Sequence, residues 1–335
     1  MKFTVIIPLY NKAPYVRKAL ETVCAQTYRD YEIIVINDGS TDNSAIIAEE
    51  YLNGVEGISY KILSQQNAGV SAARNNGVAQ ASGDYIAFLD ADDWWEPTYL
   101  ERMAQLIEDY PEAGLYGMNY IYYKPGKTRV ALKCKTGYIN YPKEYYEGSA
   151  MMIFTSSSSM PKRVFEEMGG FPLGIKLGED FLLWAKTALH YPVAFCEEPL
   201  AWYNNDVPVA LRATRNLHHP NNHMLFRMDS IAFSLSPLAS NLKSDWQALL
   251  DKLRVNGLLE YWMSKEYHDM AAQELAKVDW SKQPENVKRI YKTPIWMLKV
   301  KRQVMKWGSA VKMHLIKYKV NLTSSYEIRC STILF

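Results

Sequence analysis

Asp84-Tyr-Ile-Ala-Phe-Leu-Asp90-Ala-Asp92 is the stretch that decides how the N-terminal half of this chain folds. Its residues 85–89 are strand formers, so the two carboxylates that follow, Asp90 and Asp92, leave the end of a strand on one face. Paired hard oxygen ligands suit Mg²⁺ or Mn²⁺, which take one or two protein carboxylates and fill their remaining positions with water or phosphate. The alternative is a solvated acidic turn, because Pro97 suits the first turn of a following helix.

The chain around this stretch alternates between strand and helix patterns from residue 3 to residue 95. Apolar runs predict strands at 3–9, 32–36, 58–63 and 84–89, and apolar residues at helical spacing predict helices at 14–26, 42–53 and 70–81. Such alternation is typical of a mostly parallel, doubly wound α/β sheet, which binds ligands at the carboxyl ends of its strands. Polar residues follow each strand: Tyr10-Asn11, Asn37-Asp38, Gln66-Asn67 and Asp90-Ala91-Asp92.

The remainder of the chain divides into a strand-bearing part and a helical part. Tyrosine-rich strands are predicted within 113–135. Leu177-Gly-Glu-Asp180 leads into a predicted helix that runs through 190, and another strand is predicted at 193–203. From about residue 220 the pattern is helical, with dense Leu, Met and Trp and no strand alternation. We therefore expect a first domain at 1–205 and a helical C-terminal region at 206–335.

Charge is distributed unevenly along the chain. The 335 residues are 48% hydrophobic and carry a formal net charge of +2. The segment 286–320 holds ten Lys and Arg and no Asp or Glu, so its charge is +10 and the rest of the chain has −8. The four cysteines form no CxxC pair, which argues against zinc and redox motifs, and no apolar run reaches the ~18 residues of a spanning helix.

Five motifs along the first 205 residues agree in type, order and spacing with a known pattern. They are Ile6-Ile-Pro-Leu-Tyr-Asn11, Val35-Ile-Asn-Asp-Gly-Ser-Thr-Asp42, Asn67-Ala-Gly-Val-Ser-Ala-Ala-Arg-Asn75, Phe88-Leu-Asp-Ala-Asp-Asp93 and Gly178-Glu-Asp180. The set closely resembles glycosyltransferase family 2 on a GT-A fold. The resemblance covers residues 1–205 and says little about the residues that follow.

The resemblance implies an inverting transfer from a nucleotide-diphosphate sugar, with five residues for the donor. Tyr10 would stack on or line the base, with Pro8 nearby, and Asp38 would form a hydrogen bond with the base. Arg74 would face the nucleotide and its phosphates. Asp90 would hold the ribose or the sugar.

The resemblance also implies a metal ligand and an acceptor site. Asp92 would bind the Mn²⁺ or Mg²⁺ ion that bridges the diphosphate. Asp180 would be the general base on the acceptor hydroxyl, and Glu179 would position the acceptor. A positioned carboxylate that takes a hydroxyl proton can supply roughly 10²–10⁴-fold in rate. Inversion places the base and the leaving group on opposite faces of the sugar, so a base from a distant segment is expected.

Each of these residues also has a structural alternative. Tyr10 could be an ordinary aromatic at a strand end, Asp38 could belong to a turn and helix cap, and Arg74 could be a solvated helix residue. Glu179 and Asp180 could be first-turn acids that complement a helix dipole.

Two further groups allow two interpretations. Trp94 and Trp95 can stack on a sugar ring or pack over the edge of the sheet. His218, His219 and His223 can supply a metal ligand, but a structural or solvated role is favoured.

The chain departs from the processive members of the family, because it has neither their Gln/Arg-x-x-Arg-Trp motif nor their transmembrane helices. We therefore expect transfer of a single sugar, from a UDP-sugar to a saccharide or lipid-linked acceptor, in the synthesis of a surface polysaccharide. One alternative is a sugar-phosphate nucleotidylyltransferase, which would need a Gly-rich basic loop that residues 10–14 do not provide. The other is a non-catalytic sugar-nucleotide-binding scaffold, which the retained acids at 90, 92 and 180 disfavour.

The basic segment 286–320 has a helical pattern from Pro294, with a stripe of Met297, Val300, Val304, Trp307, Val311 and Leu315. A basic amphipathic helix is typical of binding to an anionic membrane surface. The N-terminus does not resemble a signal peptide, so we expect a cytoplasmic protein that this tail can hold on the inner face of the plasma membrane. The alternative is that the stripe packs on the protein itself or in an oligomer. Nucleic acid is not an expected partner, since no nucleic-acid-binding module is present.

Overall fold

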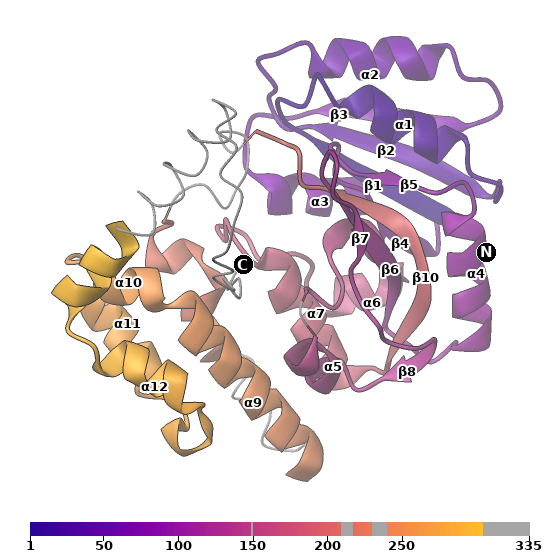
Figure 1. Ribbon diagram of the computed structural model, residues 1–335. Coiled ribbons are helices and arrows are strands. Elements are labelled where there is room, and N and C mark those ends of the chain that lie inside the picture. Colours follow the sequence, from indigo (N-terminus) through magenta and orange to yellow (C-terminus); the bar gives the residue numbers. More distant parts are fainter. Residues whose placement is uncertain (149, 209–216, 230–239, 304–335) are drawn as a thin grey trace, which may run out of the picture. The chain divides into compact units, whose positions relative to one another are not determined.

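A computed structural model describes residues 1–148, 150–208, 217–229 and 240–303 of the chain (Figure 1). Its first half is a parallel sheet of four strands in the order β3-β2-β1-β4. Every residue of β1 is buried, because β1 lies between β2 and β4. The four strands are β1 (Phe3–Leu9), β2 (Tyr31–Asn37), β3 (Ser59–Ser64) and β4 (Tyr85–Phe88).

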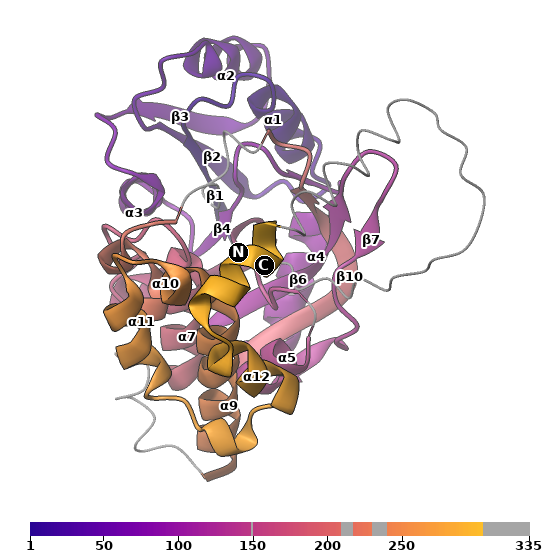
Figure 2. The ribbon, with the colours of Figure 1, turned by 60° about the vertical axis from the view of Figure 1, so that its left-hand side comes forward.

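Helices cover both faces of these four strands. In the two views of Figures 1 and 2, α1 and α2 lie on one face and α3 lies on the other. The doubly wound α/β arrangement predicted from the sequence is confirmed, and each element begins and ends within two residues of its predicted bounds. The helices are α1 (Val16–Cys24), α2 (Ser44–Asn53) and α3 (Val70–Ala79).

A glycine lets α3 approach the sheet closely. A Cβ atom on Gly77 would lie 2.8 Å from Ile6 of β1 and 3.3 Å from Ile36 of β2. Real Cβ atoms do not come as close as the first of these distances, so a side chain here would push the helix away. Arg74, one turn earlier on α3, is thereby held near the sheet.

The sheet continues beyond β4 as β9, β6, β10 and β5. β9 runs antiparallel to β4 and β6, whereas β6 and β10 are parallel to each other. The predicted strands within 113–135 and at 193–203 are confirmed. β9 is Ser-rich and was not predicted, but its hydroxyls are bonded, as when Ser159 donates to the Ile86 carbonyl at 2.9 Å. The bounds are β5 (Trp94–Trp95), β6 (Leu115–Tyr123), β7 (Arg129–Val130), β8 (Gly137–Ile139), β9 (Ser158–Pro161) and β10 (Val193–Asn204).

The remaining helices follow the predicted pattern. The helix expected after Leu177-Gly-Glu-Asp180 and through 190 is α7, and most of the described residues after 240 are helical, as expected. None of the described helices is long and apolar enough to cross a membrane. The bounds are α4 (Tyr99–Asp109), α5 (Tyr141–Glu147), η1 (Thr155–Ser157), α6 (Lys162–Glu167), α7 (Glu179–His190), η4 (Pro220–Asn222), η5 (Met224–Phe226), α9 (Ser240–Gly257), α10 (Leu259–Met263), α11 (His268–Leu275), η6 (Trp280–Lys282) and α12 (Glu285–Lys292).

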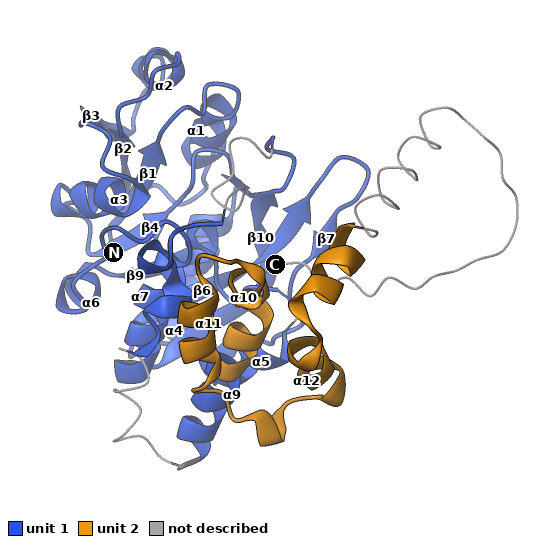
Figure 3. Ribbon diagram, turned by 90° about the vertical axis from the view of Figure 1, so that its left-hand side faces the viewer, with its two compact units in different colours: residues 1–250 blue, residues 251–335 orange. Residues whose placement is uncertain are grey.

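The chain forms two compact units, Met1–Leu250 and Asp251–Phe335 (Figure 3). The first unit extends past residue 205 because later residues pack within it. Leu177 forms a bridge with His223, and the ring of Trp246 lies 6.0 Å from that of Tyr141. That residues 1–205 and 206–335 act as separate domains stays a prediction.

Candidate active site

The carboxyl ends of the parallel strands carry the first predicted site residues. β1 and β2 are paired in register to their ends, so Tyr10 and Asp38 leave neighbouring strands at the same level. Asp90 follows β4, on the other side of β1. Tyr10 is 47% exposed, whereas Pro8 is buried within β1. The ring of Tyr10 can therefore line a ligand, and Pro8 shapes the strand that presents it.

Asp38 is almost fully buried, and its carboxylate ties the end of β2 to the loop before α3. Oδ1 accepts hydrogen bonds from the Gln65 side chain and the Ala68 N–H at 2.8 Å each, and Oδ2 accepts one from the Gly69 N–H at 2.9 Å. The carboxylate does not cap α2, whose N-cap residue is Asn43. Since a carboxylate has about four acceptor positions, these three bonds leave room for one further donor.

Asp93 is the third acid of the loop after β4, beside Asp90 and Asp92, and it holds this loop in place. It accepts hydrogen bonds from the Ser156 hydroxyl at 2.6 Å and from the Asn204 N–H at 2.9 Å. Burial, followed by the charges of Asp92 and Asp90, raises the pKa of Asp93 well above its usual value. No sequence pattern predicts this role for Asp93, although it stands directly beside the predicted metal ligand.

Asp92 forms an ion pair with Lys12, from the loop after β1. Lys12 Nζ lies 2.5 Å from Asp92 Oδ2, and each side chain is 19% exposed. Burial raises the pKa of Asp92, while Lys12 opposes that rise and Asp90 adds to it. A cationic group thus already sits at the carboxylate that the sequence predicted to hold a metal.

Arg74 joins the acidic loop after β4 to the start of α7. Its buried guanidinium donates to Asp90 Oδ1 from Nη2 at 2.7 Å and to Glu179 Oε1 from Nη1 at 2.9 Å. Nε is buried without a hydrogen-bond partner among the described residues, and the Phe171 ring lies 5.0 Å from the guanidinium carbon. Burial alone would lower the pKa of Arg74, but the two carboxylates hold it above its usual value. Arg74 is therefore not a solvated helix residue, and its contact with a donor stays a prediction.

Glu179 and Asp180 begin α7 directly after Gly178, which has a left-handed backbone with φ 82°. A Cβ atom at this glycine would collide with the Met224 side chain. Asp180 accepts hydrogen bonds from the Thr155 hydroxyl at 3.3 Å and from the Phe181 N–H at 2.7 Å. Both acids do lie in the first turn, as the structural alternative expects. Each also binds a partner from a distant segment, which a helix-dipole role does not require.

Asp180 has the proton affinity of a base that works near neutral pH. Burial, and then the charge of Glu179, raises the pKa of Asp180 to about 7, while Arg74 opposes the rise. A helix N-terminus would by itself lower this pKa. The surroundings of the carboxylate therefore outweigh the helix dipole, and a general base is most effective when its pKa lies near the working pH.

The two tryptophans after the acidic loop pack within the protein. The Trp94 ring is stacked on Trp202, with centroids 5.6 Å apart, and is 8% exposed. Trp95 is stacked on Tyr99 at 4.1 Å, and its indole N–H donates to the Ser156 carbonyl at 2.6 Å. Of the two interpretations, packing over the sheet edge describes both residues.

The histidines cap turns in the described part of the chain. The Nδ1 atoms of His219 and His223 accept hydrogen bonds from the Asn221 and Leu225 N–H groups, each at 3.2 Å. Burial, with a contribution from His218, lowers the pKa of His223 to about 4. Among residues 1–148, 150–208, 217–229 and 240–303, no three His, Cys, Asp or Glu side chains are arranged to hold a metal ion by themselves.

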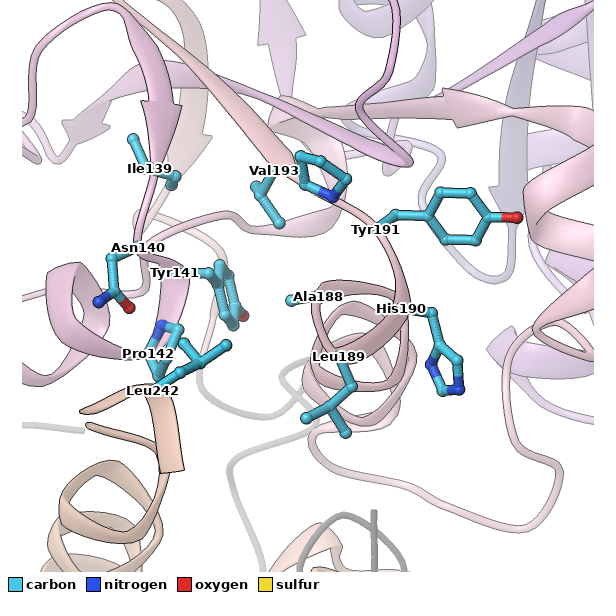
Figure 4. A pocket seen from close by; sticks show the side chains of 11 residues that line it. Ile139, Asn140, Tyr141, Pro142, Ala188, Leu189, His190, Tyr191, Val193 and Leu242 are labelled. Carbon is cyan, nitrogen blue, oxygen red and sulfur yellow. The ribbon is translucent and has the colours of Figure 1, made fainter. Parts of the chain in front are cut away.

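A cavity of about 280 Å³ lies at the opposite end of α7 from Asp180 (Figure 4). Its lining includes Tyr141 at the start of α5, Ala188 and His190 near the end of α7, and Val193 at the start of β10. A helix the length of α7 spans about 18 Å. Ala188 and His190 therefore lie well away from the carboxylate site, but Tyr141 does not, because burial, and then the charges of Tyr145 and Asp180, raise its pKa.

Replacing Arg74 with methionine is expected to lower the free energy of unfolding by about 3–5 kcal/mol, because it leaves two partly buried carboxylates without their cation. The measurement is urea unfolding of wild type and variant at neutral pH. Arg102→Met is the matched control, since the Arg102–Glu198 pair has side chains 41% and 44% exposed and should contribute at most about 1 kcal/mol. Equal losses in the two variants would contradict the central role of Arg74.

Comparison with known proteins supports the family resemblance of the five sequence motifs. The family model described as Glycosyl transferase family 2 matches residues 4–169. The chain is 38% identical to Glycosyltransferase GlyA of Streptococcus pneumoniae serotype 4 over 201 residues, which cover 56% of this chain and 28% of that protein. It is 40% identical to the Putative glycosyltransferase EpsH of Bacillus subtilis over 145 residues, covering 43% and 41%. The chain thus spans less than half the length of these two relatives.

A third relative and a solved structure extend the match over more of the chain. The Uncharacterized glycosyltransferase alr2836 of Nostoc is 30% identical over 239 residues, which cover 67% of each chain. The crystal structure of S. aureus TarS 1-349 in complex with UDP-GlcNAc superposes with a TM-score of 0.70 at 20% identity, over 87% of this chain and 84% of that one. By these matches in sequence and fold, the chain belongs to glycosyltransferase family 2 and has the GT-A fold.

Proposed function

We propose that this chain is a metal-dependent, inverting glycosyltransferase that moves a single sugar from a nucleotide-diphosphate sugar to an acceptor hydroxyl. The observation that carries the proposal is the network around Arg74, in which one buried guanidinium joins the acidic loop after β4 to the start of α7. The acidic loop suits a metal-bound diphosphate, and Asp180 on α7 suits a base. Two separate segments thus supply the groups that must act on opposite faces of the sugar.

The donor would lie along the carboxyl edge of the parallel strands. Tyr10 offers an exposed ring to the base, and Asp38 has one acceptor position left for a base N–H. Asp90, whose side chain is 30% exposed and fixed by Arg74, would hold the ribose or the sugar. TarS, which shares the fold, was solved with UDP-GlcNAc, and we propose a UDP-sugar as the donor here.

Asp92 is the residue that would hold Mn²⁺ or Mg²⁺. Its carboxylate lies in the loop after β4 and is paired with the Lys12 ammonium. One or two carboxylates suffice for these ions, because water and substrate phosphates complete the coordination. When bound, the ion would neutralise the charge that develops on the departing nucleoside diphosphate.

Asp180 would remove the proton from the acceptor hydroxyl. A pKa of about 7 keeps part of Asp180 deprotonated at neutral pH and still makes it a competent base. Its hydrogen bonds to Thr155 and the Phe181 N–H hold the carboxylate in one orientation. The Glu179 side chain is 12% exposed and forms an ion pair with Arg74. Glu179 would position the acceptor.

A nucleotide-release assay tests the proposed reaction. The chain would be incubated with a panel of UDP-sugars and Mn²⁺, with and without saccharide or lipid-linked acceptors, and free UDP would be measured. Acceptor-dependent release of UDP is the expected result. Release of pyrophosphate on incubation with UTP and a sugar phosphate would favour a nucleotidylyltransferase, and donor binding without any release would favour a scaffold.

We also propose that the basic segment brings the protein to an anionic membrane that carries a lipid-linked acceptor for surface polysaccharide. In its described part, residues 295–303 are helical, with Trp296 67%, Met297 37% and Val300 54% exposed. Lys299 and Lys301 lie on the same helix, and Arg302 beside them forms an ion pair with Glu260 of α10. Basic side chains near an anionic leaflet contribute on the order of 1 kcal/mol each. The expected stripe at Val304, Trp307, Val311 and Leu315 lies outside the described residues.

The chain is expected to co-sediment with anionic liposomes and to be released by salt, because exposed charges are screened over about 8 Å at physiological ionic strength. The double variant Lys299→Glu/Lys301→Glu should sediment less. Lys124→Glu/Lys127→Glu, at exposed positions near the β6–β7 turn, makes the same change in net charge and should sediment like wild type. Equal sedimentation of the two double variants would refute the membrane proposal, and donor hydrolysis should be unchanged in both.

A further inference from the structure

Lys12 places a positive charge where the proposed metal would bind. Its Nζ lies 2.5 Å from Asp92 Oδ2, in a pair whose side chains are only 19% exposed. A divalent ion on the same carboxylate would lie about 2.1 Å from its ligand oxygen. The ammonium and the metal would therefore compete for one group, and two cations so close repel each other strongly in a partly buried site. One has to move when the other binds.

The backbone at Lys12 is fixed, so the side chain is the part that can move. The Lys12 N–H donates to Ser44 Oγ at 2.7 Å, and its carbonyl accepts from the Val16 N–H at the start of α1, at 3.0 Å. The preceding residue, Asn11, has a left-handed φ of 51° and accepts a hydrogen bond from the Thr41 N–H at 2.8 Å. A flexible four-carbon stem on this anchored backbone allows the ammonium to leave Asp92 without refolding the loop.

The diphosphate of the donor offers the ammonium a second partner. Three acids, Asp90, Asp92 and Asp93, stand together after β4. Arg74 pairs with Asp90, so it is Lys12 that supplies the cation for Asp92 before any donor arrives. A nucleoside diphosphate bound through a metal at Asp92 would bring anionic oxygens within reach of Lys12. Lysine is an effective point-charge partner for phosphate, so the ammonium can move from carboxylate to phosphate.

We propose that Lys12 is a displaceable cation, which neutralises Asp92 before the donor binds and moves onto the donor diphosphate when a divalent ion takes its place. This inference rests on the proposed function and adds a positioning residue to it. Its consequence is that metal and donor bind as a coupled pair. Each raises the affinity of the site for the other by the same factor, as linkage requires.

Binding of Mn²⁺ and of UDP tests the proposal without any measurement of turnover. Electron paramagnetic resonance would give the Mn²⁺ affinity of wild type and of Lys12→Gln, with and without UDP, and calorimetry would give the UDP affinity at saturating Mn²⁺. Without UDP, Lys12→Gln is expected to bind Mn²⁺ about tenfold more tightly than wild type, and with Mn²⁺ it is expected to bind UDP about tenfold more weakly. The coupling between the two ligands should shrink accordingly.

Two controls separate this inference from the proposed function. Lys18→Gln removes a lysine whose Nζ lies 3.3 Å from the centre of the Trp94 ring, and it should leave both affinities unchanged. Asp92→Asn should abolish Mn²⁺ binding. Unchanged affinities in Lys12→Gln, with Mn²⁺ binding lost in Asp92→Asn, would overturn the role of Lys12 and leave the proposed function standing. Failure of wild type to bind Mn²⁺ even with UDP would overturn the metal assignment, and this inference with it.

Discussion

Asp180→Asn is expected to lower kcat by about 10²-fold or more and to leave donor affinity nearly unchanged. Asparagine keeps the shape of the side chain. Its one carbonyl oxygen can still accept the hydrogen bond from the Phe181 N–H, and its NH2 group can donate to the Thr155 hydroxyl oxygen. It cannot take the proton of an acceptor hydroxyl. The measurements are UDP release at saturating donor and acceptor, and calorimetric binding of the donor in the absence of acceptor.

Asp269→Asn is the matched control, because Asp269 is also a first-turn acid, on α11, and is exposed. If Asp180 only complemented the dipole of α7, the two variants would behave alike. A loss of donor binding in Asp180→Asn, with kcat preserved, would equally refute the assignment of Asp180 as the base.

The raised pKa of Asp180 sets the direction in which kcat/KM and stability change with pH. The kcat/KM of wild type should fall about tenfold for each pH unit below about 7, as Asp180 takes up a proton. The pKa in the folded chain lies above its usual value of 3.8, so between these two values the folded state holds a proton that the unfolded state has lost. The contribution of Asp180 to stability therefore falls as pH rises through this window and stays low above it.

Asp180→Asn removes the cost of burying a charged carboxylate, so the variant is expected to be more stable than wild type at pH 8. Thermal unfolding of both proteins at pH 5 and pH 8 provides the measurement. A variant that loses turnover while gaining stability cannot have lost it by unfolding. A variant less stable than wild type at pH 8 would show that the carboxylate stabilises the folded state, contrary to the direction of its pKa shift.

Local sequence patterns were sufficient to predict the parallel half of the fold. The seven residues of β1, apolar except for Thr4, predict a strand that is buried on both faces, and β1 is the strand between β2 and β4. Parallel strands bring their carboxyl ends to one edge whatever the length of the intervening helices. For that reason Tyr10, Asp38 and Asp90, which are far apart in sequence, could be assigned to one site.

The pairings inside the site could not be predicted, because they depend on side chains from distant segments. Arg74 and Glu179 are 105 residues apart, and Lys12 and Asp92 are 80 apart. No periodicity links such residues. Trp94 illustrates the same limit, since an aromatic side chain near a strand end suits sugar stacking and packing equally well. Its pairing with Trp202 in β5 and β10 decides between them.

Chelation is expected to abolish turnover, and Mn²⁺ or Mg²⁺ to restore it, if Asp92 holds the ion that bridges the diphosphate. Asp92→Asn should weaken donor binding in the presence of Mn²⁺ and leave the fold intact, because asparagine can still accept a hydrogen bond from Lys12. Asp84→Asn, the same change at an exposed position beside the start of β4, is the control. UDP release after dialysis against chelator and metal add-back, with circular dichroism of each variant, provides the measurements.

Because Lys12 pairs with Asp92, both loss and retention of turnover in chelator are informative. A lysine ammonium carries one charge and can approach one phosphate at a time as a point charge, whereas a divalent ion carries two charges and can bridge two phosphates. If the bridging ion supplies the stabilisation of the leaving group, Lys12 cannot replace it, and turnover is lost in chelator. Full turnover in excess chelator would instead mean that Lys12 suffices at the diphosphate, and that Asp92 serves to hold the ammonium rather than a metal.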